Sequence, residues 1–140
     1  MSEPRPQAWP LPAPGDIVWC LFPHLPEIEP GPKPRPAIVL SVERKEDGAI
    51  VQVVYGTSQA VMRLRAGEIT ISKAAYPAAY AQAGLAYDTK FDFKKSIELP
   101  WTERYFKAAP QKPYGNTPKL GTLHATILRA VEAAYRAALA

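Results

Sequence analysis

The sequence predicts a small, mainly β protein of the α+β class, a barrel or sandwich with a short middle helix and a C-terminal helix. About five to seven short apolar runs, rich in β-branched and aromatic residues and bounded by glycine or proline, are typical of strands. An alanine-rich stretch in the middle and a helical repeat of apolar residues at the end predict the two helices. The chain has 140 residues, which fits one domain.

The chain opens with a proline-rich leader over residues 1–14, expected to be flexible or polyproline-like, before one domain over residues 15–140. The leader lacks the apolar core of a secretory signal. A Gly-Asp pair starting at Gly15 then turns the chain into a first strand over residues 17–22. Residues 23–36 are rich in proline, which removes backbone donors, so we expect a long stiffened loop there.

Two runs rich in Val and Ile follow the loop and predict strands over residues 37–42 and 50–55. The Asp-Gly pair at 47–48 is a hairpin turn signal between them. Two shorter strands are expected over residues 60–64 and 68–72.

The middle of the chain changes character. Residues 74–83 predict a short helix, with Pro77 in its first turn and Gly84 as its stop. Short strands are expected over residues 91–93 and 96–99, on either side of a pair of lysines.

The last part of the chain contains the clearest helix. Residues 110–118 are expected to be loop. Apolar side chains then recur at helical spacing from Leu123 to Leu139, with charged residues between them, and His124 is suited to the helix entry.

Composition restricts the class of protein but does not identify it. The net charge of +4 and the pI near 9.2 suit a polyanionic partner. Cys20 is the only cysteine, so neither an internal disulfide nor a cysteine-based zinc site is expected. No segment reaches the roughly 18 apolar residues of a membrane span. We therefore expect a cytoplasmic protein without a membrane partner.

Three segments together resemble the MazF/PemK family of toxins. They are PGDIVW at residues 14–19, RPAIVLS at 35–41 and GTSQ at 56–59, in matching order and spacing. The similarity is strong over residues 14–60 and weaker over 84–99.

The resemblance implies the fold and activity of that family. The expected fold is a small SH3-like β-barrel of the MazF/CcdB type that forms a two-fold homodimer. The expected activity is that of a type II toxin, a metal-independent endoribonuclease that cleaves single-stranded RNA, such as mRNA, without any cofactor. The expected protein partner is a cognate antitoxin.

The resemblance also implies the catalytic residues. The family's catalytic arginine and threonine match Arg35 and Thr57 here. Attack by a ribose 2′-hydroxyl builds negative charge on the phosphorane oxygens, which a guanidinium and a hydroxyl stabilise. The candidates for RNA binding or transition-state support are Ser58, Gln59, Lys33 and His24.

Without the resemblance, the same residues have ordinary interpretations. Arg35 is typical of a solvated loop arginine, and Thr57 and Ser58 are typical of residues that satisfy a turn. His24 suits acid–base chemistry near neutral pH, but the family motif does not require it. Tyr55 has a ring that can stack on a base, yet tyrosines on strands are commonly half-buried packing residues.

Two other functions remain open at this point. One is a non-catalytic barrel of the same fold that binds a protein, as the gyrase-poisoning toxins do, and the other is a module that binds nucleic acid without cutting. Residues 62–120 form a longer segment than a minimal barrel needs, so the family's substrate preference does not transfer to this chain.

Overall fold

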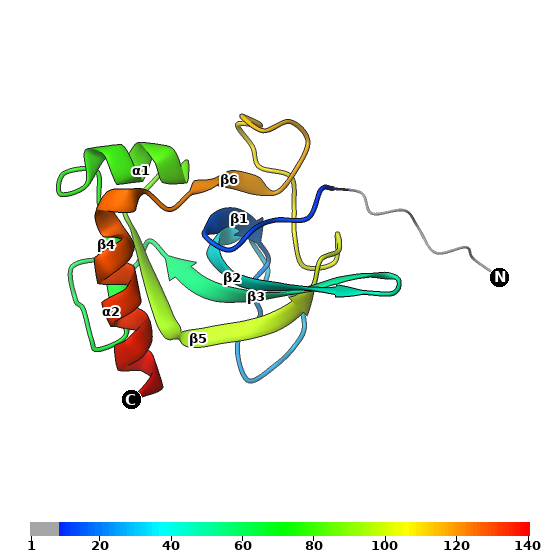
Figure 1. The fold of residues 1–140 in the computed structure, drawn as a ribbon, viewed down its shortest axis with the longest axis horizontal. Coiled ribbons are helices and arrows are strands. Elements are labelled where there is room, and N and C mark those ends of the chain that lie inside the picture. The colour runs from blue at the N-terminus through cyan, green and yellow to red at the C-terminus, as the bar shows by residue number, and fades with distance from the viewer. Residues whose placement is uncertain (1–8) are drawn as a thin grey trace.

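The computed structural model describes residues 9–140, and this part of the chain is mostly β (Figure 1). Six antiparallel strands form one sheet in the order β4-β5-β3-β2-β1-β6. The predicted mainly β class, with a middle helix and a C-terminal helix, is confirmed. The strands are β1 (Asp16–Cys20), β2 (Arg35–Lys45), β3 (Gly48–Thr57), β4 (Glu68–Ile71), β5 (Thr89–Pro100) and β6 (Lys119–Thr122).

The sheet is open. Strands β4 and β6 are its outer members, and among residues 9–140 no ladder joins them. The curved strands follow one another around the centre of the molecule without closing into a barrel through their hydrogen bonds (Figure 1).

The β2–β3 hairpin is one of the two longest pairings in the sheet, with eight residue pairs, as many as between β3 and β5. Its register sets Ala37 opposite Tyr55 and Lys45 opposite Gly48, so the predicted hairpin is confirmed, with its turn at residues 46–47 and Gly48 already in β3. Both strands extend beyond the predicted apolar runs, because backbone pairing continues into an exposed, charged tip. At that tip the Lys45 ammonium lies 2.8 Å from a carboxylate oxygen of Glu43, and this contact raises the pKa of Lys45.

The expected strand over residues 60–64 is absent, and turns occupy that segment. Ala60 has a positive φ of 50°, and the Arg63 amide donates to its carbonyl oxygen. The segment is held to the sheet by a side chain instead of a ladder, since the Thr70 hydroxyl donates to the carbonyl oxygen of Val61. Alternating apolar residues therefore gave a false strand signal here.

The expected strands over residues 91–93 and 96–99 are one continuous strand, β5. Its register against β3 shifts between Val54, which lies opposite Ser96, and Tyr55, which lies opposite Asp92. The intervening residues of β5 form a bulge, which explains why the apolar pattern is interrupted without ending the strand.

Strand β6 was not predicted, and residues 119–122 had no assignment between the expected loop at 110–118 and the helical pattern from Leu123. It has only four residues, and Leu120 is its single large apolar residue. It pairs with β1, so it is defined by a long-range partner and not by its own periodicity.

Two hydrophobic cores cover the two faces of the sheet, which is why β1 buries consecutive residues such as Ile17 and Val18. On one face, strand side chains meet the helices α1 (Pro77–Ala83) and α2 (Leu128–Leu139). On the other face they meet Trp9 and the aromatic residues that follow β5, and this core contains Cys20, Phe22, Val51, Val53, Trp101, Tyr105 and Phe106.

Both predicted helices are present. Helix α1 begins at Pro77, three residues later than predicted, and ends at Ala83, before Gly84, whose φ of 70° favours glycine. A short 3-10 turn over Ala125–Ile127 precedes α2, and the His124 ring caps it by accepting from the Thr126 amide at 3.1 Å. Among residues 9–140, no helix is long and apolar enough to cross a membrane.

Part of the proline-rich leader, residues 9–14, packs against the rest of the domain; residues 1–8 lie outside the described residues. Trp9 is buried, and its ring packs against Trp101 with 5.7 Å between centroids. The Trp101 indole N–H donates to the carbonyl oxygen of Pro10, and the Gly15 amide donates to that of Val39. Residues 9–14 therefore cover one face of the sheet.

Candidate functional site

Arg35 is the first residue of β2, directly after the proline-rich loop. It was expected within that loop, but β1 pairs with β2 so that Arg35 lies opposite the buried Cys20. Pro34 and Pro36 flank it and restrict its backbone. The residue is half-buried, so the sheet sets its position.

Two cationic side chains meet one aromatic ring beside this strand. The Arg35 guanidinium carbon lies 5.9 Å from the centroid of Tyr55 on β3. The Lys95 ammonium, on β5, lies 5.3 Å from the same centroid. The ring of Phe22 packs against Tyr55 at 5.1 Å between centroids. Positive charges from two different strands are thus gathered around one aromatic ring. This group of Arg35, Tyr55, Lys95 and Phe22 is called the Tyr55 corner below.

Neither cation has a carboxylate partner among residues 9–140. Within residues 9–140, no Asp or Glu oxygen lies within 4.0 Å of the charged nitrogens of Arg35 or Lys95. Both charges are therefore available to an external anion, and a guanidinium presents the planar fork that suits phosphate oxygens.

Thr57 is the last residue of β3 and is 9% exposed. The β2–β3 ladder ends at the pair of Ala37 and Tyr55, so Arg35 on β2 and Thr57 on β3 each lie two residues beyond its last pair. The backbones approach closely here, since a Cβ on Gly56 would overlap the carbonyl oxygen of Pro36. The two residues implied to be catalytic therefore lie on neighbouring strands, each next to this close approach of Pro36 and Gly56.

The Thr57 hydroxyl organises the turn that follows the strand. Its oxygen accepts a hydrogen bond from the Gln59 amide at 3.1 Å. This contact does not use the hydroxyl hydrogen, which can donate to a ligand. Ser58 and Gln59 are exposed in this turn, and Lys33 is exposed in the loop before Arg35.

A pocket of about 220 Å³ opens beside the Tyr55 ring. Its walls come from the start of the first loop and from β3 and β5, and His24 is one of the lining residues. Lys33, Ser58 and Gln59 do not line it. The complete lining is Phe22, Pro23, His24, Leu25, Tyr55 and Lys95.

Cys20, which lies opposite Arg35, is not a reactive thiol. Burial raises the pKa of the Cys20 thiol, so it stays protonated and is a poor nucleophile near neutral pH. In the part of the chain that the structure describes, no three His, Cys, Asp or Glu side chains come together as a metal-binding group.

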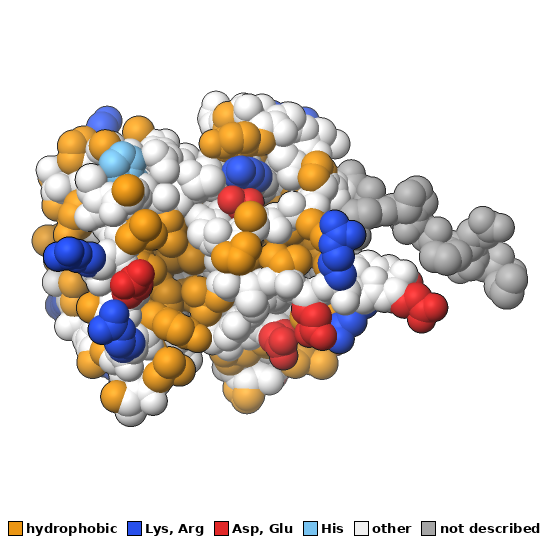
Figure 2. Space-filling view, in the orientation of Figure 1, with side chains coloured by type: hydrophobic (Ala, Val, Ile, Leu, Met, Phe, Trp, Pro, Cys, Tyr) orange, Lys and Arg blue, Asp and Glu red, His pale blue; other side chains and the backbone are white. Residues whose placement is uncertain are grey.

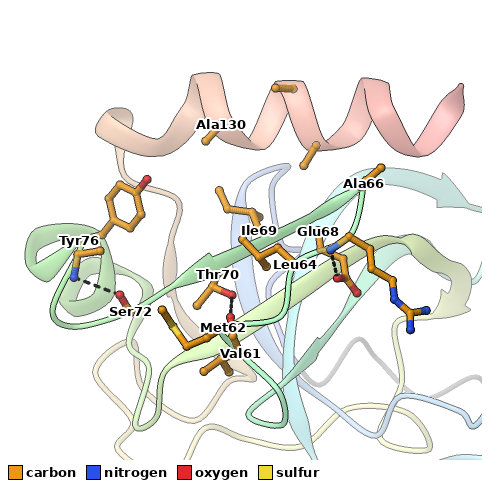
Figure 3. Close-up of a pocket in the computed structure, with 15 residues that line it drawn as sticks. Val61, Met62, Leu64, Ala66, Glu68, Ile69, Thr70, Ser72, Tyr76 and Ala130 are labelled. Atoms are coloured by element: carbon orange, nitrogen blue, oxygen red, sulfur yellow. Dashed lines mark hydrogen bonds between the residues drawn. The ribbon is translucent and has the colours of Figure 1, made fainter.

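A second, larger hollow of about 540 Å³ lies between β4, the preceding turns and helix α2 (Figure 3). Its polar groups form hydrogen bonds with one another. The Thr70 hydroxyl donates to the carbonyl oxygen of Val61, and the Arg65 amide donates to a carboxylate oxygen of Glu68. Met62 and Leu64 line it and are 83% and 54% exposed. This hollow suits apolar side chains, whereas the Tyr55 corner suits an anion.

The surface drawn in Figure 2 shows apolar and charged side chains in different places. On the face drawn in Figure 2, hydrophobic side chains gather in the depression between α2 and the strands. Most acidic side chains visible there lie toward the β2–β3 hairpin, away from α2. Positive side chains are dispersed over this face, so no broad basic patch marks a site on it.

Sequence reasoning missed two residues of the Tyr55 corner, Lys95 and Phe22. The only available signal for Lys95 was the lysine pair that interrupts an apolar run. Phe22 read as the end of a strand, although it follows β1 and packs on Tyr55.

Comparison with known families gives one match. The family described as the PemK-like, MazF-like toxin of type II toxin–antitoxin systems matches residues 13–139, which is nearly the whole chain. No curated protein matches the sequence.

Proposed function

Because the chain belongs to the PemK-like, MazF-like toxins of type II toxin–antitoxin systems, we propose that it is an endoribonuclease whose site is the corner formed by Arg35, Thr57 and Tyr55. The observation that carries the proposal is the half-buried Arg35 guanidinium, held over the Tyr55 ring without a carboxylate partner among the described residues. An arginine in that state is suited to bind a phosphate.

The reaction that fits these groups is intramolecular attack within single-stranded RNA. The ribose 2′-oxygen bonds to the adjacent phosphorus, the bond from phosphorus to the 5′-oxygen breaks, and the leaving oxygen takes a proton. The products are a 2′,3′-cyclic phosphate and a 5′-hydroxyl end. The proton lost by the 2′-hydroxyl balances the one gained, so no co-reactant is needed.

Arg35 and Thr57 have different tasks in this proposal. The guanidinium fork of Arg35 binds the non-bridging oxygens, whose negative charge grows in the transition state. The Thr57 hydroxyl donates to the same phosphate while its oxygen holds the Gln59 amide. Ser58, Gln59, Lys33 and His24 support RNA binding.

The partners follow from the family and from the proposed substrate. A type II toxin has an antitoxin partner. We infer that an acidic antitoxin segment covers the loop before Arg35, that the toxin is a homodimer of SH3-like subunits, and that it acts on mRNA in the cytoplasm. The curved antiparallel order of the strands supports the SH3-like assignment, although the outer strands β4 and β6 are not paired with each other in the described residues.

The test is incubation of the purified protein with a long RNA in EDTA, followed by mapping of the cut ends. We expect cuts within single-stranded regions that leave 5′-hydroxyl ends. Arg129→Ala, on the exposed face of α2, is a control that should cut at the wild-type rate. A folded wild-type protein that leaves the RNA intact would exclude the nuclease.

A second candidate function has its own observation. The apolar hollow beside Met62 and Leu64 favours a non-catalytic toxin that binds a protein target. The EDTA experiment separates the two functions, and RNA that is bound but never cut would instead favour a nucleic-acid-binding module.

A further inference from the structure

The bulge in β5 places Lys95 at the Tyr55 corner. Between the pairs Val54–Ser96 and Tyr55–Asp92, strand β5 contains more residues than β3. A carboxylate oxygen of Asp92 accepts from the Lys94 amide at 3.0 Å, which stabilises the bulge. Bulges commonly redirect a side chain, and here the Lys95 ammonium lies 5.3 Å from the Tyr55 centroid.

The charge of Lys95 faces a hollow with aromatic walls. Phe22 and Tyr55 form two sides of the pocket, and Lys95 is the cation among its lining residues, none of which is acidic. At about 220 Å³ the pocket suits a single planar ring, not a larger ligand. Aromatic walls with an adjacent cation are the usual platform for one unpaired nucleobase.

Lys95 and Arg35 are also held by the same ring. Each has its charged group within 6 Å of the Tyr55 centroid, so both are fixed relative to each other by the β3 strand. Arg35 and Thr57 each adjoin the close approach of Pro36 and Gly56, whereas Lys95 lines the pocket. The two cations therefore mark two neighbouring anion positions with an aromatic pocket next to them.

We propose that the pocket of Phe22, Tyr55 and Lys95 is a nucleotide subsite next to the cleaved bond. Its base packs against the two aromatic rings, and Lys95 binds the phosphate that flanks the one at Arg35. This inference rests on the proposed function. Lys95 contributes to substrate binding at this subsite, and the reacting phosphate belongs to Arg35 and Thr57.

The probe for this subsite is a single-stranded oligonucleotide with 2′-O-methyl riboses, which lacks the attacking hydroxyl and cannot be cut. We expect Lys95→Gln to raise its Kd about five- to tenfold at one fixed salt concentration. The slope of log K against log salt should fall by about 0.7, the value for one lost contact to a single strand. In cleavage assays KM should rise while kcat changes little.

Matched variants make the result specific. Lys94→Gln removes the neighbouring exposed lysine, which does not line the pocket, and should leave Kd and the salt slope unchanged. Lys95→Arg keeps the charge and should retain most of the binding, and Tyr55→Leu should weaken binding more than Tyr55→Phe. Melting curves of all variants confirm that they are folded.

The outcomes separate this inference from the proposed function. Equal Kd and salt slope for wild type and Lys95→Gln would overturn the subsite, even if RNA is cut and Arg35→Ala is inactive. Absence of binding by the wild-type protein would overturn it as well. A lysine-specific loss of binding in a protein that never cuts RNA would support the subsite while excluding the nuclease.

Discussion

Arg35 is held by the sheet in a position that suits the reaction proposed for the site. Strand pairing fixes its backbone, and the Tyr55 ring holds its charge without neutralising it. A cation–π contact stabilises a guanidinium by about 0.5–2 kcal/mol, much less than it costs to bury an unpaired charge. The geometry is therefore suited to present the charge to a phosphate.

We predict that Arg35→Ala lowers kcat/KM for RNA about a hundredfold or more while the protein stays folded. Removal of a transition-state charge stabiliser has an effect of this size. Arg35→Lys should not restore full activity, because an ammonium cannot form the planar fork. Cleavage rates and melting curves at one salt concentration test this, with Arg129→Ala as the control. Full activity in folded Arg35→Ala would rule out the site.

Thr57→Val should reduce cleavage about tenfold, since the substitution keeps the shape and removes the donor. It should also lower the free energy of unfolding by about 1 kcal/mol, because the Gln59 amide loses its acceptor. Thr57→Ser keeps the hydroxyl and should retain most of the activity. His24→Gln should change kcat little, because His24 is assigned to RNA binding and not to the reaction, and a complete loss of kcat would assign proton transfer to that histidine.

At the scale of elements, the close approach of β2 and β3 sets the geometry of the site. A Cβ at Gly56 would overlap the carbonyl oxygen of Pro36 and lie 2.8 Å from the Phe91 ring. We predict that Gly56→Ala lowers the free energy of unfolding by about 2 kcal/mol, as other overpacked sites do. It should also reduce cleavage. Urea titration measures the first effect, and unchanged stability would contradict the packing.

Trp9 is the residue through which the leader packs against the sheet. Its indole is 6% exposed and packs edge-on against Trp101. Trp9→Ala should lower the free energy of unfolding by about 3 kcal/mol, the scale for truncation of a buried aromatic residue. Arg129→Ala, at an exposed residue of α2, is the control and should change it little. Equal denaturation midpoints for the two variants would show that residues 9–14 do not stabilise the domain.

The elements that sequence reasoning predicted well carry their signal locally. The central strands are runs of β-branched residues, and α2 has one apolar stripe that buries Val131 and Ala134. Strand β6 has no such pattern, and its residues form a strand through their backbone pairing with β1. The same limit applies to the site: Arg35 and Thr57 came from a family motif, whereas Lys95 reaches Tyr55 only through a bulge that no local pattern predicts.

At the scale of the whole molecule, the described surface leaves several large apolar side chains in water. Met62 and Leu64 are more than half exposed beside the apolar hollow, and Leu139 at the end of α2 is 70% exposed. Large apolar side chains that gather at one hollow are typical of protein–protein contact surfaces. The family resemblance implies a two-fold homodimer, in which each copy presents the same surface to the other.

We predict that the free toxin is a homodimer at micromolar concentration. Light scattering should return close to twice the chain mass of 15.4 kDa. The mass should stay the same when salt is raised from about 0.1 to about 1 M, because screening weakens ion pairs but not the burial of apolar surface. Dissociation at high salt would instead indicate a contact between charges. A mass of 15.4 kDa at both salt concentrations would show a monomer, and the site at Arg35 would then have to be complete within one chain.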